Sequence, residues 1–140
     1  AEAAPPKAQE PPSRRPLRLL LVEDHLDTAE AMAELLRSFG HDVRVAMSVA
    51  AGLEAAASEM LGAGIDLVIS DLGLPDGTGM DLMRELVSRY GLRGIALSGY
   101  GTEEDVRRSL DAGFSRHLTK PVNFQALEAV IHETAGARPS

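Results

Sequence analysis

Short apolar runs alternate with amphipathic stretches along most of the chain, and this alternation limits the possible folds more than any other feature. Two apolar runs, residues 17–22 and 65–70, are nearly continuous, which is typical of strands buried on both faces. Residues 29–39 and 80–90 carry apolar side chains at helical spacing, and a glycine follows each stretch. Five such strand–helix units of about 20–25 residues predict an α/β fold, with helices on both faces of a parallel five-stranded sheet.

The first sixteen residues differ from the rest of the chain. They hold five of the eight prolines and almost no large apolar side chain, so they cannot offset the entropy of ordering themselves. We interpret residues 1–16 as a proline-rich linker or tail, residues 17–135 as one domain, and residues 136–140 as a C-terminal tail.

Charge and composition exclude several functions. The net charge is −7, and an acidic surface repels a phosphate backbone, so we expect no direct nucleic-acid binding. There is no cysteine, which excludes disulfides, thiolate metal ligands and cysteine nucleophiles. No apolar run approaches the ~20 residues that span a bilayer, so we expect a cytoplasmic domain without membrane contact, although a parent protein could be membrane-anchored.

Polar side chains follow four of the predicted strands at their carboxyl ends: Glu23 and Asp24, Asp71, Ser98, and Lys120. Each alone is explained as a helix cap, a loop hydroxyl or a solvated charge. In a flavodoxin-like strand order 2-1-3-4-5, however, the first and third strands are neighbours and the three carboxylates converge. Such carboxylates need a divalent cation or a shared proton, and oxygen donors without a nearby His or Cys favour Mg²⁺ or Mn²⁺. With the amine and the hydroxyl, this set suits phosphoryl transfer to Asp71.

Four stretches of the sequence resemble the receiver domain of two-component response regulators. They are LLVED at residues 20–24, VISDLGLP at 68–75, ALSG at 96–99 and LTKP at 118–121. The resemblance covers residues 17–135 and implies the flavodoxin-like (βα)5 fold with strand order 2-1-3-4-5.

The resemblance also implies roles for single residues. Asp71 is expected to accept a phosphoryl group from a phosphohistidine donor, which is a histidine kinase or a histidine phosphotransfer protein. Asp24 is expected to bind Mg²⁺ directly and Glu23 through water, with the backbone carbonyl of Gly73 as a further ligand. Lys120 is expected to pair with the phosphoryl oxygens.

Further roles concern the regulation of the site. Ser98 is similar to the switch hydroxyl that moves toward the phosphoryl group, and the bond from Lys120 to Pro121 is expected to be cis. His117 stands where receivers often carry Tyr or Phe, so its function as a switch residue is open; a solvated surface histidine is the alternative. Tyr100 is a candidate for influencing the phosphoryl lifetime, because Gly73 has no side chain to shelter the group.

Gly99 is a further candidate modulator beside Ser98, as is Pro121 beside the lysine. The other histidines, His25, His41 and His132, show no metal-ligand spacing, and we expect His132 to be solvated.

The leading functional hypothesis is a phosphoacceptor module. No output domain follows residue 135, and a proline-rich segment precedes the domain, which favours the C-terminal receiver of a hybrid sensor histidine kinase. The alternative is a stand-alone single-domain response regulator or phosphorelay shuttle. A small Mg²⁺-dependent phosphohydrolase is less favoured, because glycine occupies position 73 where such enzymes carry a second Asp. A flavin-binding module and a partner-binding domain without phosphorylation are also disfavoured.

Overall fold

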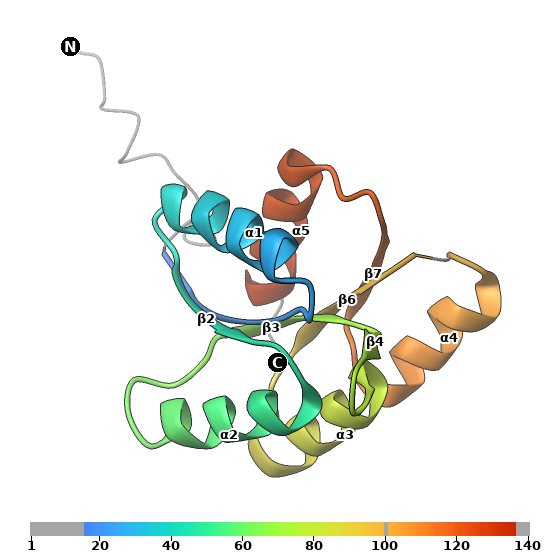
Figure 1. Ribbon diagram of the computed structural model, residues 1–140, viewed down its shortest axis with the longest axis horizontal. Coiled ribbons are helices and arrows are strands. Elements are labelled where there is room, and N and C mark those ends of the chain that lie inside the picture. Colours follow the sequence, from blue (N-terminus) through green and yellow to red (C-terminus); the bar gives the residue numbers. More distant parts are fainter. Residues whose placement is uncertain (1–15, 100, 137–140) are drawn as a thin grey trace.

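The computed structural model describes residues 16–99 and 101–136. Predictions that concern residues 1–15, Tyr100 and residues 137–140 lie outside these described residues, and the domain boundaries stay predictions. Five parallel strands form the sheet in the order β2-β1-β3-β6-β7 (Figure 1). Their bounds are β1 Arg18–Val22, β2 Asp42–Ala46, β3 Leu67–Asp71, β6 Gly94–Ser98 and β7 Arg116–Thr119. This is the predicted flavodoxin-like order, and only the strand numbers differ, because two short strands are counted between β3 and β6.

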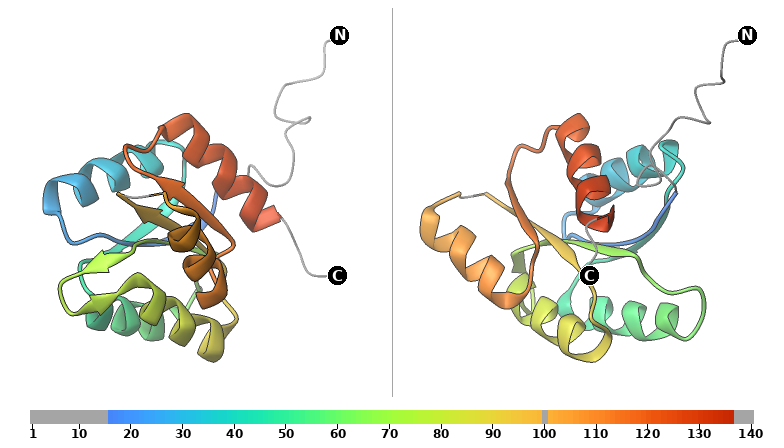
Figure 2. Two further views of the ribbon diagram at one scale, coloured as in Figure 1. Left: turned by 90° about the vertical axis from the view of Figure 1, so that its right-hand side faces the viewer. Right: turned by 180° about the vertical axis from the view of Figure 1, so that it is seen from behind.

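In the described part of the chain five helices cover the sheet, with α1 and α5 on one face and α2, α3 and α4 on the other (Figures 1 and 2). Their bounds are α1 Leu26–Ser38, α2 Val49–Met60, α3 Gly79–Tyr90, α4 Glu103–Ala112 and α5 Phe124–Gly136. Among the helices that the structure describes, none combines the length and the apolar character needed to cross a membrane.

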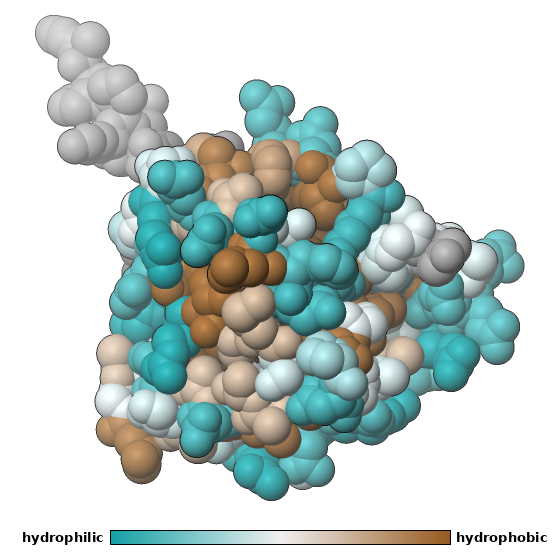
Figure 3. All heavy atoms as spheres, in the orientation of Figure 1, coloured by the Kyte–Doolittle hydropathy of each residue, from teal (hydrophilic) through white to brown (hydrophobic). Residues whose placement is uncertain are grey.

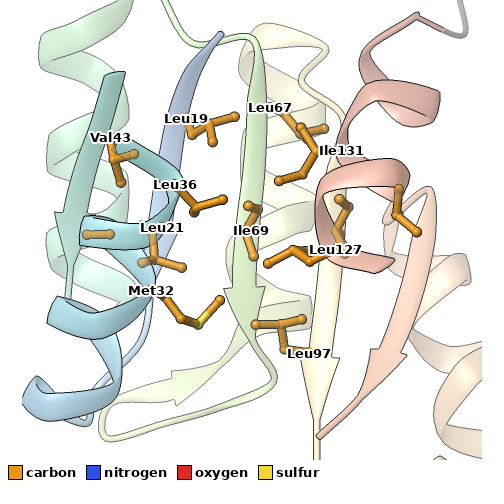
Figure 4. Packing of buried hydrophobic residues seen from close by; sticks show 13 residues of the cluster. Leu19, Leu21, Met32, Leu36, Val43, Leu67, Ile69, Leu97, Leu127 and Ile131 are labelled. Atoms are coloured by element: carbon orange, nitrogen blue, oxygen red, sulfur yellow. The ribbon is translucent and has the colours of Figure 1, made fainter. Parts of the chain in front are cut away.

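Alternate residues of the central strands point to opposite faces of the sheet and build two cores. Toward α1 and α5 the strands contribute Leu19, Leu21, Ile69 and Leu97 (Figure 4). Toward α2 and α3 they contribute Leu20, Val22, Val68 and Ala96. This is why the strand sequences are continuously apolar, since both faces are buried. On the surface seen in Figure 3, hydrophilic side chains surround smaller hydrophobic areas.

The loop after β3 is more regular than the sequence indicates. Its residues form a small antiparallel hairpin of β4 (Gly73–Leu74) and β5 (Gly77–Thr78). The carboxylate of Asp76 accepts hydrogen bonds from the backbone N–H groups of Val49 and Ala50 at 2.7 and 2.9 Å, and these bonds lower the pKa of Asp76. The hairpin is thereby tied to the start of α2, which fixes the chain just after Asp71.

Side-chain caps begin four of the five helices. Ser48, Thr78, Thr102 and Asn123 each accept a hydrogen bond from the backbone N–H three residues later. The exception is α1, whose N-cap residue is His25 and makes no side-chain cap hydrogen bond. The imidazole of His25 is turned instead toward the acidic residues that precede it.

Candidate functional site

Three carboxylates and one ammonium meet at the carboxyl ends of the strands. Glu23 follows β1, Asp71 ends β3, and these strands are neighbours in the register Val22↔Ser70. The Nζ atom of Lys120, after β7, lies 2.9 Å from Oδ2 of Asp71 and 3.2 Å from Oε1 of Glu23. The convergence expected from the strand order is therefore present in the structure.

Burial and charge act against each other at these groups. Burial raises the pKa of Asp71, as do the charges of Glu23 and Asp24, and Lys120 only partly offsets this. Burial also raises the pKa of Glu23, but hydrogen bonds from His25 and the ammonium of Lys120 outweigh it, so the pKa of Glu23 is lowered. Burial lowers the pKa of Lys120, yet Asp71 and Glu23 outweigh it, so the net shift is upward. The lysine thus stays charged at neutral pH.

The donor atoms fit a divalent cation. Oδ1 of Asp24 is buried and has no hydrogen-bond partner among the residues that the structure describes, although Nδ1 of His25 lies 3.4 Å away. A buried anionic oxygen is costly unless a cation lies beside it. One donor atom each from Glu23, Asp24, His25 and Asp71 lies within 4.8 Å of the other three. Three acids facing one ammonium leave a negative site, which attracts a cation.

The backbone around Asp71 is closely packed by a glycine that the sequence analysis did not single out. Gly79, the first residue of α3, donates its N–H to the carbonyl of Leu72 at 2.9 Å. A Cβ atom on Gly79 would lie 2.2 Å from the carbonyl oxygen of Asp71. The N–H of Leu72 also donates to Oδ1 of Asp71 at 3.0 Å, so both the backbone and the side chain of Asp71 are fixed in place.

Ser98 and His117 are hydrogen-bonded to each other. His117 pairs with Ala96 in the register of β6 and β7, which places it on the same face as Ser98, two residues further along. Oγ of Ser98 lies 2.9 Å from Nε2 of His117. The imidazole is half-buried, and burial lowers its pKa against the opposing charge of Asp105. His117 is therefore neutral at pH 7 and is not a fully solvated histidine.

The remaining predicted site residues lie around this edge. Gly73 is in β4 and exposed, and Gly99 is exposed directly after β6. The Lys120–Pro121 peptide bond is cis, as the resemblance implies. The hypothesis about Tyr100 concerns a residue outside the described part of the chain.

The expectation of an oxygen-only donor set without a nearby histidine is wrong. Nδ1 of His25 lies 3.0 Å from Oε2 of Glu23 and 3.4 Å from Oδ1 of Asp24. The backbone N–H of His25 also donates to Oε2 of Glu23 at 3.0 Å. The sequence showed His25 beside these acids, but the direction of its ring depends on how the strand turns into α1.

The expectation that His132 is solvated is also wrong. His41, Glu128 and His132 form a second group of titratable side chains, here called the histidine–glutamate cluster. Nε2 of His41 lies 3.1 Å from both carboxylate oxygens of Glu128, and Nε2 of His132 lies 2.5 Å from one of them. Both imidazoles are buried. The i, i+4 spacing on α5 was visible in the sequence, but the distant partner His41 was not.

The histidine–glutamate cluster is a hydrogen-bonded bridge between α5 and the start of β2. Nδ1 of His41 accepts the N–H of Leu17 at 3.0 Å, so in the neutral ring the proton is on Nε2 and points at Glu128. A histidine that binds a metal through one ring nitrogen usually donates a proton from the other. In His41 that other nitrogen would be Nδ1, and it faces the N–H donor of Leu17. The donor atoms of the histidine–glutamate cluster are near enough to one another for a metal. The proton on Nε2 of His41, which points at Glu128, opposes metal binding there.

Comparison with known proteins gives a consistent result. Residues 19–132 match the response regulator receiver domain family. The chain is 38% identical over 120 residues to the aerobic respiration control sensor protein ArcB of Escherichia coli (strain K12), covering 82% of this chain but 15% of that protein. It is 32% identical over 124 residues to an uncharacterized 14.6 kDa protein of Leptolyngbya boryana, covering 86% of this chain and 92% of that protein. A solved receiver domain protein from Clostridium thermocellum matches with a TM-score of 0.79 and 27% identity, covering 86% of this chain and 94% of that one.

Proposed function

The chain belongs to the response regulator receiver domain family of two-component signalling, and from this premise we propose that Asp71 accepts a phosphoryl group from a phosphohistidine donor. The observation that carries the proposal is the position of Lys120, whose Nζ atom lies 2.9 Å from Oδ2 of Asp71. A charged amine at this place is suited to the oxygens of an incoming phosphoryl group.

The residues suggest the following steps. A carboxylate oxygen of Asp71 attacks the phosphorus, and the P–N bond breaks with its electron pair left on the donor imidazole. Lys120 moves its hydrogen bond from Asp71 to a phosphoryl oxygen, while Glu23 keeps the ammonium in place from 3.2 Å. Ser98 offers its hydroxyl to another phosphoryl oxygen and gives up its contact with His117.

Receiver domains generally use Mg²⁺ at an acidic pocket, and the acids here suit such an ion. We propose that Asp24 and Asp71 hold it directly, Glu23 through water, and Gly73 through its carbonyl. When bound, Mg²⁺ or Mn²⁺ supplies positive charge that offsets the charge of the transferring phosphoryl group. The buried oxygen of Asp24, which has no hydrogen bond within the described residues, supports this assignment.

Incubation with acetyl phosphate and Mg²⁺, followed by intact-protein mass spectrometry, tests the proposal. Wild type should gain one phosphoryl group, and the adduct should not form with EDTA. Asp71→Asn should gain none, whereas Asp111→Asn, an exposed aspartate on α4, should behave as wild type. An adduct of equal yield on Asp71→Asn would refute the assignment.

We propose that the domain is the C-terminal receiver of a hybrid sensor histidine kinase, which the match to a much longer sensor protein supports. A stand-alone regulator is the second candidate, favoured by the Leptolyngbya boryana protein of nearly the same length. An antibody against the domain distinguishes them, because it detects either one long polypeptide or one of about the length of this chain in cell extract. A phosphohydrolase function would require turnover of a phosphomonoester, which we expect to be absent.

A further inference from the structure

The N-cap of α1 differs from those of the other helices. Ser48, Thr78, Thr102 and Asn123 use their side chains to cap α2, α3, α4 and α5. His25 makes no such bond, and histidine is not among the residues preferred at this position. The side chain at this position therefore contributes no cap to its own helix, and its contacts lie elsewhere.

Those contacts are with two of the acids. Nδ1 of His25 lies 3.0 Å from Oε2 of Glu23 and 3.4 Å from Oδ1 of Asp24. The second oxygen is the buried one that has no hydrogen-bond partner in the described part of the chain. The side chain of His25 is 71% exposed, whereas that of Glu23 is fully buried. The imidazole is thus next to the place where a cation would complete the environment of Asp24.

The spread of the donor atoms agrees with one ion. One ring nitrogen of His25 and one oxygen each of Glu23, Asp24 and Asp71 lie within 4.8 Å of one another. Metal–ligand bonds are about 2.0–2.2 Å long, so small side-chain movements would bring the nitrogen of His25 and the oxygens of Asp24 and Asp71 to one centre, with Glu23 reached through water.

In this structure Nδ1 of His25 donates to Oε2 of Glu23 at 3.0 Å, because a carboxylate oxygen only accepts, so a bound metal ion would have to displace that proton. A neutral ring that binds a metal through Nδ1 carries its proton on Nε2. With 71% of the side chain exposed, Nε2 of His25 can donate that proton to water. His41 in the histidine–glutamate cluster is the opposite case, because its Nδ1 accepts the N–H of Leu17 and its Nε2 lone pair is not available.

We propose that His25 is a nitrogen ligand of the divalent cation at the acidic site and shifts its preference from Mg²⁺ toward Mn²⁺, Co²⁺ and Zn²⁺. Mg²⁺ takes oxygen ligands and keeps several waters, so an imidazole adds little to its binding. Imidazole suits the later first-row metals, and their affinities rise along that series. The inference rests on the proposed function, which places a divalent ion among the same carboxylates.

Calorimetric titration of the full chain with Mg²⁺, Co²⁺ and Zn²⁺ tests the preference. His25→Phe should weaken Co²⁺ and Zn²⁺ binding by about tenfold or more, since even the outer-shell partners of metal ligands contribute about 10–100-fold in affinity. The Mg²⁺ affinity of the same variant should change by less than about twofold, and this serves as the internal control for correct folding. His25→Gln, which keeps polarity but removes the imidazole, should behave as His25→Phe. Equal losses for Mg²⁺ and Co²⁺, or no loss for Co²⁺ and Zn²⁺, would overturn the inference.

Pulsed EPR of the Mn²⁺-loaded protein tests ligation itself. Wild type should show the modulation of a directly bound nitrogen, and His25→Phe should bind Mn²⁺ without it. A nitrogen signal that persists in His25→Phe would place the metal elsewhere and refute the role of His25. If wild type and His25→Phe bind Mn²⁺ alike without nitrogen modulation, the inference fails and the proposed metal site stands. If wild type binds no divalent ion, the metal site fails as well.

Discussion

Replacement of Gly79 by alanine is expected to damage the protein at the phosphoacceptor, because the first turn of α3 packs directly on the backbone of Asp71. The added Cβ would lie 2.2 Å from the carbonyl oxygen of Asp71 and 3.0 Å from Oγ of Ser70. Real Cβ atoms essentially never approach closer than 3.0 Å, so α3 and the end of β3 must separate by at least about 0.8 Å. The closest atom, the carbonyl oxygen of Asp71, belongs to the backbone and cannot turn away as a side chain could.

Two magnitudes follow from that displacement. Overpacking of a close contact costs typically about 1–3 kcal/mol in unfolding free energy. In an exposed helix, the same replacement would stabilise the protein by up to about 1 kcal/mol, because alanine is the better helix former. The sign of the change in unfolding free energy therefore distinguishes overpacking, which destabilises, from helix propensity, which stabilises. A shift of about 1 Å in a reacting group also slows its chemistry by about 10²-fold.

Urea unfolding and the rate of phosphoryl uptake from acetyl phosphate measure the two effects of Gly79→Ala. The matched control is Gly62→Ala, because a Cβ at Gly62 would meet its nearest neighbouring atom at 3.8 Å, an ordinary contact. Gly62→Ala should leave both quantities near wild type. If Gly79→Ala is as stable as Gly62→Ala and takes up phosphoryl at the wild-type rate, the described packing of Asp71 is wrong.

Three other perturbations have expected outcomes. Lys120→Met should slow phosphoryl uptake by about 10²-fold. The pKa of Lys120 is raised above 10.5, so the stability from its contact with Asp71 is full below pH 10.5 and is lost as the pH rises further. Urea unfolding of the variant at a series of pH values should lack that alkaline loss of stability. Burial holds the pKa of His117 below 6.5, so the unfolded chain protonates first and the unfolding free energy of wild type should fall as the pH decreases below 6.5. His117→Phe should lack this fall. An equal dependence of unfolding free energy on pH in both proteins would contradict the burial of the ring beside Ser98. Glu128→Ala leaves two buried imidazole N–H groups without their acceptor. It should therefore lower the unfolding free energy, measured with urea, by about 1–3 kcal/mol. An unchanged value would refute the described histidine–glutamate cluster.

The fold was predictable because it follows from periodicity. Continuous apolar runs such as residues 65–70 predict strands buried on both faces, and the two cores on either side of the sheet explain why. The convergence of Asp24, Asp71 and Lys120 was predictable for a related reason, since the carboxyl ends of parallel strands meet at one edge.

The missed features depend on packing between distant segments or on the direction of one side chain. His41 meets Glu128 across 87 residues, and no local pattern marks that contact. Gly79 is one of thirteen glycines, and only the approach of α3 to Asp71 shows why a side chain there is excluded. The ring of His25 could have been directed to solvent, and the sequence does not decide this.

The identity of the residue that carries the phosphoryl group tests the central claim most directly. Borohydride reduces an aspartyl phosphate to homoserine, so treatment of the phosphorylated protein followed by peptide mapping locates the modified residue. We predict homoserine at position 71 and at no other acidic position. Homoserine at Asp24 or Glu23 instead, or a phosphoryl adduct that resists borohydride, would contradict the assignment of Asp71 as the phosphoacceptor.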